Sequence, residues 1–231
     1  MHLRNYSRAF CLVGSAFVFG AALTAQAAVV PLGGGWQAEW DPGLDPFVDI
    51  VPNPNNPIGD AVFIQKSAEF TQPPVGGIFP SIPIVFRQVD ANAVHNIVID
   101  DEIITNNTGV DWTDFHLTIL NGPDAAFDPV ATMNSGGPPP IGWYIAPFTQ
   151  AAFTPDNMRL DIRGGTVPAS PAPGSVWFPG NGPANGQLWI NVNPQPQAPF
   201  TVFTLKEQPT PEPATLALLA MGAVIGLRRR R

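Results

Sequence analysis

The sequence predicts an all-β protein whose body is a single antiparallel β-sandwich of short strands. Between residues 28 and 208, 25 prolines and 18 glycines fill 43 of 181 positions, so no helix longer than about three turns is expected there. Apolar and polar residues alternate with a period of two in several segments, which is the pattern of half-buried strands. Roughly nine or ten such segments, separated by Pro- and Gly-rich turns, are typical of a sandwich.

The N-terminus has the three parts of a secretory signal peptide. Arg4 and Arg8 form the basic region, and Ala9–Leu23 forms an apolar run that is expected to be a helix. Ala25 and Ala27 supply the small residues of a cleavage site. We therefore predict export, with signal peptidase cutting after Ala27. An uncleaved membrane anchor is the alternative, although the apolar run is short for a membrane span.

The alternation is clearest in residues 112–120. One face carries Phe115, Leu117 and Ile119, and the other carries Trp112, Asp114, His116 and Thr118. Residues 95–106 precede it across a turn-prone stretch, so the two segments are predicted to form a hairpin or a connection at one end of the sandwich. The other expected strands lie in residues 35–40, 60–70, 82–89, 142–148, 157–164, 187–192 and 200–207.

The C-terminal tail has a different composition from the body. Prolines should keep residues 209–213 extended and exposed, and Ala214–Leu227 carries no charge. As a helix this apolar run would be about 21 Å long, against a hydrocarbon core of roughly 30 Å. A short transmembrane helix that packs poorly on the body is therefore predicted, with the terminal arginines held on the cytoplasmic side. The chain thus divides into a signal peptide (1–27), a body (28–208) and a tail (209–231).

The order of these parts resembles that of the PEP-CTERM proteins. The matching residues are Pro211, Glu212 and Pro213, then the apolar run Ala214–Leu227, and then the basic residues Arg228, Arg229, Arg230 and Arg231. The resemblance implies that an exosortase, a membrane-embedded cysteine peptidase or transpeptidase, processes the tail. It also implies an inner-membrane intermediate and a final place in the cell envelope or in an exopolysaccharide matrix. An ordinary C-terminal tail anchor is the alternative.

The charge and the cysteine content of the body exclude several classes of function. Its 17 acidic and five basic residues give a net charge of −12, which is unfavourable for binding nucleic acid or anionic lipid. It contains no cysteine, so it has neither a disulfide nor a Cys–His catalytic pair. No G-x-S-x-G motif occurs, and its two histidines, His95 and His116, lie outside any metal-ligand motif. No cofactor is expected.

The densest acidic cluster is a weak candidate for a calcium site. Asp100, Asp101 and Glu102 are consecutive, and carboxylate oxygens are suitable ligands for Ca²⁺. The favoured interpretation is a solvated acidic edge, because charge runs usually face water. Pairs of carboxylates also occur in glycoside hydrolases, but the sequence does not select one pair among so many acids.

All six tryptophans of the chain lie in the body, where exposed rings would stack on sugars. Core packing is the favoured role for each of them, and Trp112 and Trp177, which lie beside loops, are the candidates for glycan contact. The sequence therefore favours an exported, non-enzymatic envelope or matrix protein, associated with exopolysaccharide. A carbohydrate- or calcium-binding module is the first alternative, and a glycan hydrolase is the second.

Overall fold

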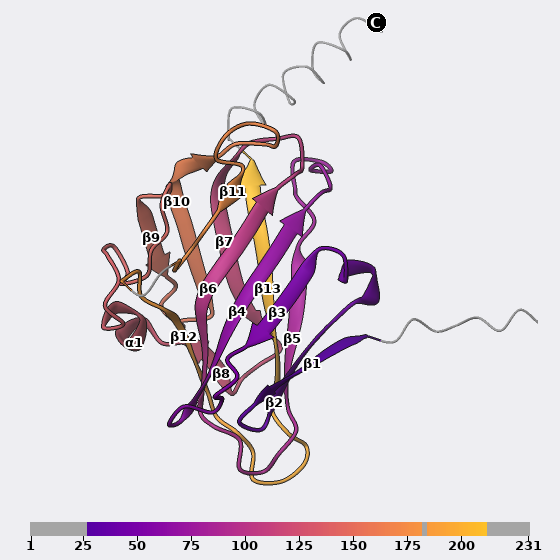
Figure 1. Ribbon diagram of the computed structural model, residues 1–231, viewed down its shortest axis with the longest axis vertical. Coiled ribbons are helices and arrows are strands. Elements are labelled where there is room, and N and C mark those ends of the chain that lie inside the picture. The colour runs from indigo at the N-terminus through magenta and orange to yellow at the C-terminus, as the bar shows by residue number, and fades with distance from the viewer. Residues whose placement is uncertain (1–26, 182–183, 212–231) are drawn as a thin grey trace, which may run out of the picture.

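The computed structural model describes residues 27–181 and 184–211, and these residues form two β-sheets around one shared core (Figure 1). The seven-stranded sheet contains, in spatial order, β1 (Ala28–Gly33), β2 (Trp36–Trp40), β5 (Ile82–Gln88), β13 (Val202–Pro211), β7 (Trp112–Leu120), β10 (Arg159–Val167) and β9 (Gln150–Phe153). The six-stranded sheet contains β3 (Val48–Pro52), β4 (Ala61–Phe70), β6 (Asn96–Asn106), β12 (Leu188–Val192) and β8 (Ala125–Phe127), with β11 (Val176–Trp177) also paired to β6.

Helix is scarce in the described residues, as the Pro and Gly content predicted. It consists of the 3₁₀ turn η1 (Pro42–Leu44) and the five-residue helix α1 (Pro129–Met133). None of the helices within the described part of the chain is long and apolar enough to cross a membrane. The expected signal helix and the expected tail helix both lie outside the described residues.

The all-β prediction is confirmed, but the sheets are not purely antiparallel. β4 and β6 run parallel to each other, whereas every other pair among the described strands is antiparallel. The reason lies in the connection between them. After β4 the chain crosses to the seven-stranded sheet, passes through β5 in the opposite direction and then returns to the six-stranded sheet as β6. β6 therefore starts at the same end of the sheet as β4, and β5 serves as the crossover that a parallel pair requires.

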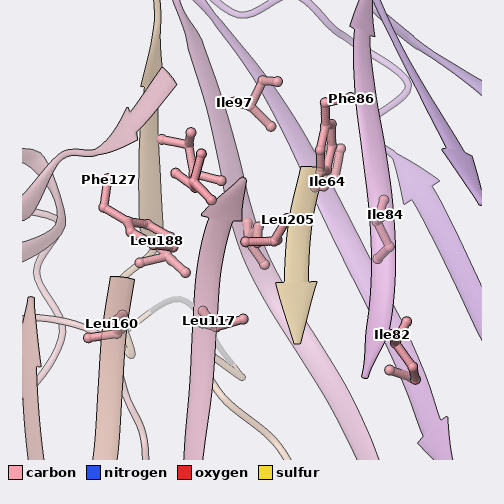
Figure 2. Close-up of a cluster of buried hydrophobic side chains, with 14 of the residues drawn as sticks. Ile64, Ile82, Ile84, Phe86, Ile97, Leu117, Phe127, Leu160, Leu188 and Leu205 are labelled. Atoms are coloured by element: carbon pink, nitrogen blue, oxygen red, sulfur yellow. The ribbon is translucent and has the colours of Figure 1, made fainter. Parts of the chain in front are cut away.

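The core lies between the two sheets and is built by the predicted alternation. Phe115, Leu117 and Ile119 are almost completely buried, which confirms the inward face that the sequence indicated for β7. Figure 2 shows apolar side chains from both sheets meeting in this core, for example Ile64 of β4 and Leu205 of β13. β6 and β7 belong to different sheets, so their connection crosses the end of the molecule and the hairpin interpretation is wrong.

Residues 142–148 were expected to form a strand and instead form an irregular loop. Trp143 and Ile145 are buried, so the apolar composition of this segment reflects burial and not a sheet. Its backbone groups are satisfied by another loop, because Tyr144 N donates to Asn185 O (2.7 Å) and Tyr144 O accepts from Gly180 N (2.9 Å). Pro140 closely precedes the segment and Pro147 lies within it, and a proline lacks the N–H that a ladder requires.

β13 continues past residue 208, so the expected exposed strip begins inside the fold. The backbone of residues 209–211 is extended, as predicted, but Pro209 and Pro211 are buried and pair with Phe115 and Trp112 of β7. Alternate residues of β13 face the core, and this alternation carries both prolines inward. β5 pairs with β13 only as far as Glu207, and a proline is better tolerated where a strand has one partner.

Candidate functional site

The outer face of the six-stranded sheet carries a shallow trough over β3, β4 and β6. Val51 of β3, Ile103 of β6 and Phe178 line it, and their exposed fractions are 51%, 45% and 41%. Phe178 comes directly after β11 in the chain. The segment that contains it runs alongside β6, since Glu102 N donates to Pro179 O (3.0 Å). The hollow has a volume of about 240 Å³, which is below the usual size of a drug-binding pocket.

Polar side chains surround these apolar residues. Asp49 and Gln65 lie on exposed positions of β3 and β4, and Asn181 lies on the loop beside Phe178. Gln65 Nε2 donates to Asp101 Oδ2 (3.1 Å), which fixes one carboxylate at the rim. The trough therefore combines a small apolar floor with amides and carboxylates that donate to and accept from hydroxyl groups.

A second hollow of about 110 Å³ adjoins the trough, and both are lined by Val51 and Gln65. Phe63 lies at its wall and contacts Trp189 edge to face, with ring centroids 6.0 Å apart. Asp100 also borders this hollow and accepts a hydrogen bond from Gln187 Nε2 (2.8 Å). Trp189 is the half-buried tryptophan of this face, and nothing in the sequence distinguished it from the other five.

The three consecutive acids do not form the calcium site that was considered for them. Ile64 pairs with Ile99 and Gln65 pairs with Asp101, so Asp100 is the extra residue of a β-bulge. The bulge reverses the alternation of β6, and Glu102 points into the core. Within residues 27–181 and 184–211, no group of three or more His, Cys, Asp or Glu side chains is placed to hold a metal ion.

Trp112 and Trp177 are both buried, so neither ring is available for the glycan contact that was predicted. Trp112 is 0% exposed and Trp177 is 1% exposed. The pairing of β13 with β7 skips Thr113, and this irregularity turns Trp112 towards the core. There Trp112 contacts the ring of Phe70 with centroids 5.2 Å apart. Trp177 packs on Phe115 and Phe148 and donates from Nε1 to Ile145 O (3.1 Å).

Glu102 belongs to a buried group of ionisable side chains that sequence reasoning missed. Lys66 of β4 contacts both Glu102 of β6 and Glu207 of β13, and all three side chains are fully buried. Burial lowers the pKa of the Lys66 amine, and the nearby charge of Glu207 opposes that shift without cancelling it. The even spacing of inward residues on β4 and β13 was the available signal, because it places Lys66 and Glu207 on the core faces of their strands.

The two histidines of the body lie in separate places and do not share a site. His95 Nδ1 lies 3.0 Å from Asp60 Oδ1, and hydrogen bonds from the His95 backbone and ring lower the pKa of Asp60. His116 Nδ1 lies 2.7 Å from Asp161 Oδ1 on the outer face of the seven-stranded sheet. Each histidine therefore has a carboxylate partner of its own.

The sorting residues lie at the edge of the described chain or beyond it. Pro211 ends β13 and is buried, whereas Glu212, Pro213 and the arginines 228–231 lie outside the described residues. Ala27 is exposed and directly precedes β1, and Ala25 lies outside the described residues.

Comparison with known proteins concerns this same tail. Residues 209–231 match the family model of the PEP-CTERM protein-sorting motif, so the predicted sorting signal is confirmed. The match includes the last three residues of β13. No curated protein is significantly similar to the chain. No solved structure matches it either. The motif marks a protein that is sorted through an exosortase to the cell surface.

Proposed function

We propose that the chain is an exported, non-enzymatic protein of the cell envelope or extracellular matrix. Its β-sandwich body is the delivered part, and its tail is the signal that an exosortase processes after signal peptidase has removed the N-terminal segment. The observation that supports this proposal is the continuity of β13 with the sorting motif matched at residues 209–231. Glu212 follows directly after the last buried residue of a strand that lies between β5 and β7.

This continuity has a consequence for processing. β13 pairs with β5 and β7, so the body is folded up to the residue where the Pro-Glu-Pro sequence begins. Exosortase should therefore act on a folded body, and its cut should fall after Pro211, because cleavage within a paired strand requires that strand to open first. The product would retain its complete body at the cell surface.

Intact-protein mass spectrometry of the exported protein tests the sorting step. The wild-type protein should lack the arginines 228–231 in a strain with active exosortase, and the Glu212→Gln variant should retain them. Glu69→Gln is the matched control, because Glu69 is a body carboxylate far from the tail in sequence. A wild-type protein that keeps its full C-terminus in the active strain would contradict the assignment.

The second candidate function is carbohydrate binding by the trough on the six-stranded sheet. Val51, Ile103 and Phe178 offer apolar contact for the faces of sugar rings, and Gln65 and Asn181 offer amides to hydroxyl groups. The hollow of about 240 Å³ is open and shallow, which suits a chain of sugars that passes across a surface. This arrangement supports an association with exopolysaccharide.

Binding of the exported protein to the producer's own polysaccharide tests this candidate. Phe178→Ala and Val51→Ala should each weaken binding severalfold, and Val75→Ala, which alters an exposed valine elsewhere, should not. Equal binding by all three variants would reject the trough. Loss of binding on removal of calcium would favour the calcium-dependent alternative, and release of sugar fragments would indicate a hydrolase.

A further inference from the structure

Three ionisable side chains meet in the core at the junction of the two sheets. Lys66 comes from β4 and Glu102 from β6, and these two are direct cross-strand partners in the parallel pair. Glu207 approaches from β13 of the opposite sheet. Lys66 Nζ contacts Oε1 of both carboxyl groups, and no part of the three side chains reaches solvent.

Beyond these contacts with one another, the three side chains have no polar partner among the described residues. No other described group donates to or accepts from Lys66 Nζ or the four carboxyl oxygens. Buried charges are normally stabilised by several hydrogen bonds, and in a buried pair without them the desolvation penalty can exceed the attraction between the charges. Two carboxylates beside one ammonium also leave one negative charge uncompensated. The geometry places a nitrogen against two carboxyl groups at a position closed to bulk solvent.

We propose that Lys66 Nζ and Glu102 Cδ form an intramolecular amide bond, with Glu207 as the catalytic residue that transfers the protons. The neutral amine of Lys66 attacks Cδ of the protonated Glu102 carboxyl group. Glu207 takes a proton from the nitrogen and delivers it to the departing hydroxyl group. The C–N bond forms, the C–OH bond breaks and one water molecule leaves, so no oxidant or cofactor is required.

The site favours this reaction for three physical reasons. Burial lowers the pKa of Lys66, which increases the fraction of neutral, nucleophilic amine. The reacting groups are held in contact, and such fixed geometry corresponds to effective concentrations on the order of 10⁵–10⁸ M in well-oriented intramolecular reactions. The product also removes two buried ionisable groups, leaving a neutral amide and one carboxylic acid that can hydrogen-bond to each other.

The positions of the two glutamates assign their roles. Lys66 and Glu102 lie opposite each other in adjacent strands of one sheet, so an amide between them fits the existing register. Glu207 belongs to the other sheet and reaches the same nitrogen from across the core. Such a bond would tie β4 to β6 covalently in an exported body that has no cysteine, which is the role that disulfides have elsewhere.

Mass spectrometry of the folded, exported protein tests the proposal directly. We expect a mass lower by one water molecule than the processed sequence requires, and a branched peptide that joins Lys66 to Glu102. Lys66→Met should abolish the bridge, and Glu207→Leu should leave the folded protein largely unbridged. Glu102→Gln should yield the same bridged product, because the amide then forms with loss of ammonia. Lys206→Met, at a partly exposed neighbouring lysine, should retain the bridge.

Three outcomes would overturn the proposal. The first is a folded wild-type protein with the full, unbridged mass. The second is a branched peptide that joins Lys66 to Glu207, which would reverse the roles of the two glutamates. The third is a folded Glu207→Leu variant, verified by circular dichroism, that forms the bridge as completely as the wild type does.

Discussion

Two buried polar side chains of β6, Asn106 and Glu102, lie four residues apart and face the same core, yet their surroundings differ completely. Asn106 Nδ2 donates to Val110 O and to Val167 O, both at 3.0 Å. Its Oδ1 accepts from the backbone N–H and from the hydroxyl group of Thr108. Glu102 has no hydrogen bond to its carboxyl oxygens from any described residue, and its contact is with Lys66.

The difference shows two uses of a polar group in one core. The Asn106 amide is fully occupied, and it ties β6 and the turn after it to β10 of the opposite sheet. A neutral amide with every donor and acceptor occupied is stable where it lies. The cluster of Lys66, Glu102 and Glu207 brings reactive groups together without satisfying them. The first arrangement holds the architecture, and the second is suited to chemistry.

Breaking the ionisable cluster should produce the largest loss of stability. In Lys66→Met neither the ion pair nor the amide can form, so two carboxyl groups stay in the core without the amine they contact, and loss of one partner of a buried ion pair typically costs about 3–5 kcal/mol. Urea unfolding of the exported protein would measure the change in the free energy of unfolding. Lys206→Met is the control and should change it by less than about 0.5 kcal/mol, as is usual for surface substitutions.

The triple variant Lys66→Met, Glu102→Leu and Glu207→Leu sharpens the same test. It removes the orphaned carboxyl groups together with the amine, and well-packed apolar replacements of buried ion pairs are often neutral or stabilising. The triple variant should therefore recover part of the stability that Lys66→Met loses. If Lys66→Met alone were as stable as the wild type, the two buried carboxyl groups would carry no energetic cost without the lysine.

Breaking the amide cluster should have the next largest effect. Asn106→Ala leaves the carbonyl oxygen of Val167 and the backbone N–H of Thr108 without this partner, whereas Thr108 Oγ1 still donates to Val110 O (3.0 Å). Unsatisfied buried groups cost about 1–3 kcal/mol each, with partial relief from water, so a loss of about 2–3 kcal/mol is expected. Asn191→Ala, at an exposed position of β12, is the matched control in the same urea titration. Equal midpoints for the two variants would contradict the account.

The sequence predicted the strands around these clusters better than it predicted the clusters themselves. Alternation identified β7 and β13, because their inward residues follow a strict period of two over most of each strand. Glu102 was interpreted as part of a solvated edge because the bulge at Asp100, which turns it inward, has no Gly or Pro to mark it. A one-residue shift exchanges the two faces of a strand, so an unmarked bulge reverses every assignment after it.

The sequence pattern did not indicate the burial of these aromatic and proline residues either. In a regular strand Trp112 would lie on the same face as Asp114 and His116. Only the irregularity at Thr113 places it inside. Pro209 and Pro211 suggested an open strip because proline is rare in paired strands. Whether two segments share a sheet depends on contacts distant in the sequence, which is why the parallel pairing of β4 with β6 was not foreseen.

Truncation at the end of β13 should have a smaller effect on stability, and it distinguishes the body from the tail. Deletion of residues 212–231 should leave the unfolding midpoint nearly unchanged, because the last described strand ends at Pro211. Deletion of residues 209–231 also removes two buried prolines that pair with β7, and a loss of about 1–2 kcal/mol is expected from the lost burial. Thermal or urea unfolding of both forms measures the difference, and identical midpoints would show that residues 209–211 contribute nothing to the body.

The smallest effect concerns His116, a half-buried polar side chain on the outer face of the seven-stranded sheet. Burial, and then the positive charge of Arg159, lower the pKa of His116, although the partner Asp161 opposes both. The folded state therefore binds a proton less readily than the unfolded state does, whose histidine titrates near pH 6.5. Stability contributed by neutral His116 is present above about pH 6.5 and declines as the pH falls below it.

Substitution by a neutral side chain isolates this contribution. His116→Gln should show a smaller decline in its urea midpoint between about pH 8 and pH 5.5 than the wild type does, since glutamine gains no proton. The shifts of Glu39 and Asp60 act at lower pH, because they are carboxyl groups with lowered pKa values. Other titrating groups are common to both proteins, so the difference between the two pH profiles reports His116 alone. Parallel profiles, or a steeper decline in the variant, would show that Asp161 outweighs burial and Arg159 and that the sign of the shift is wrong.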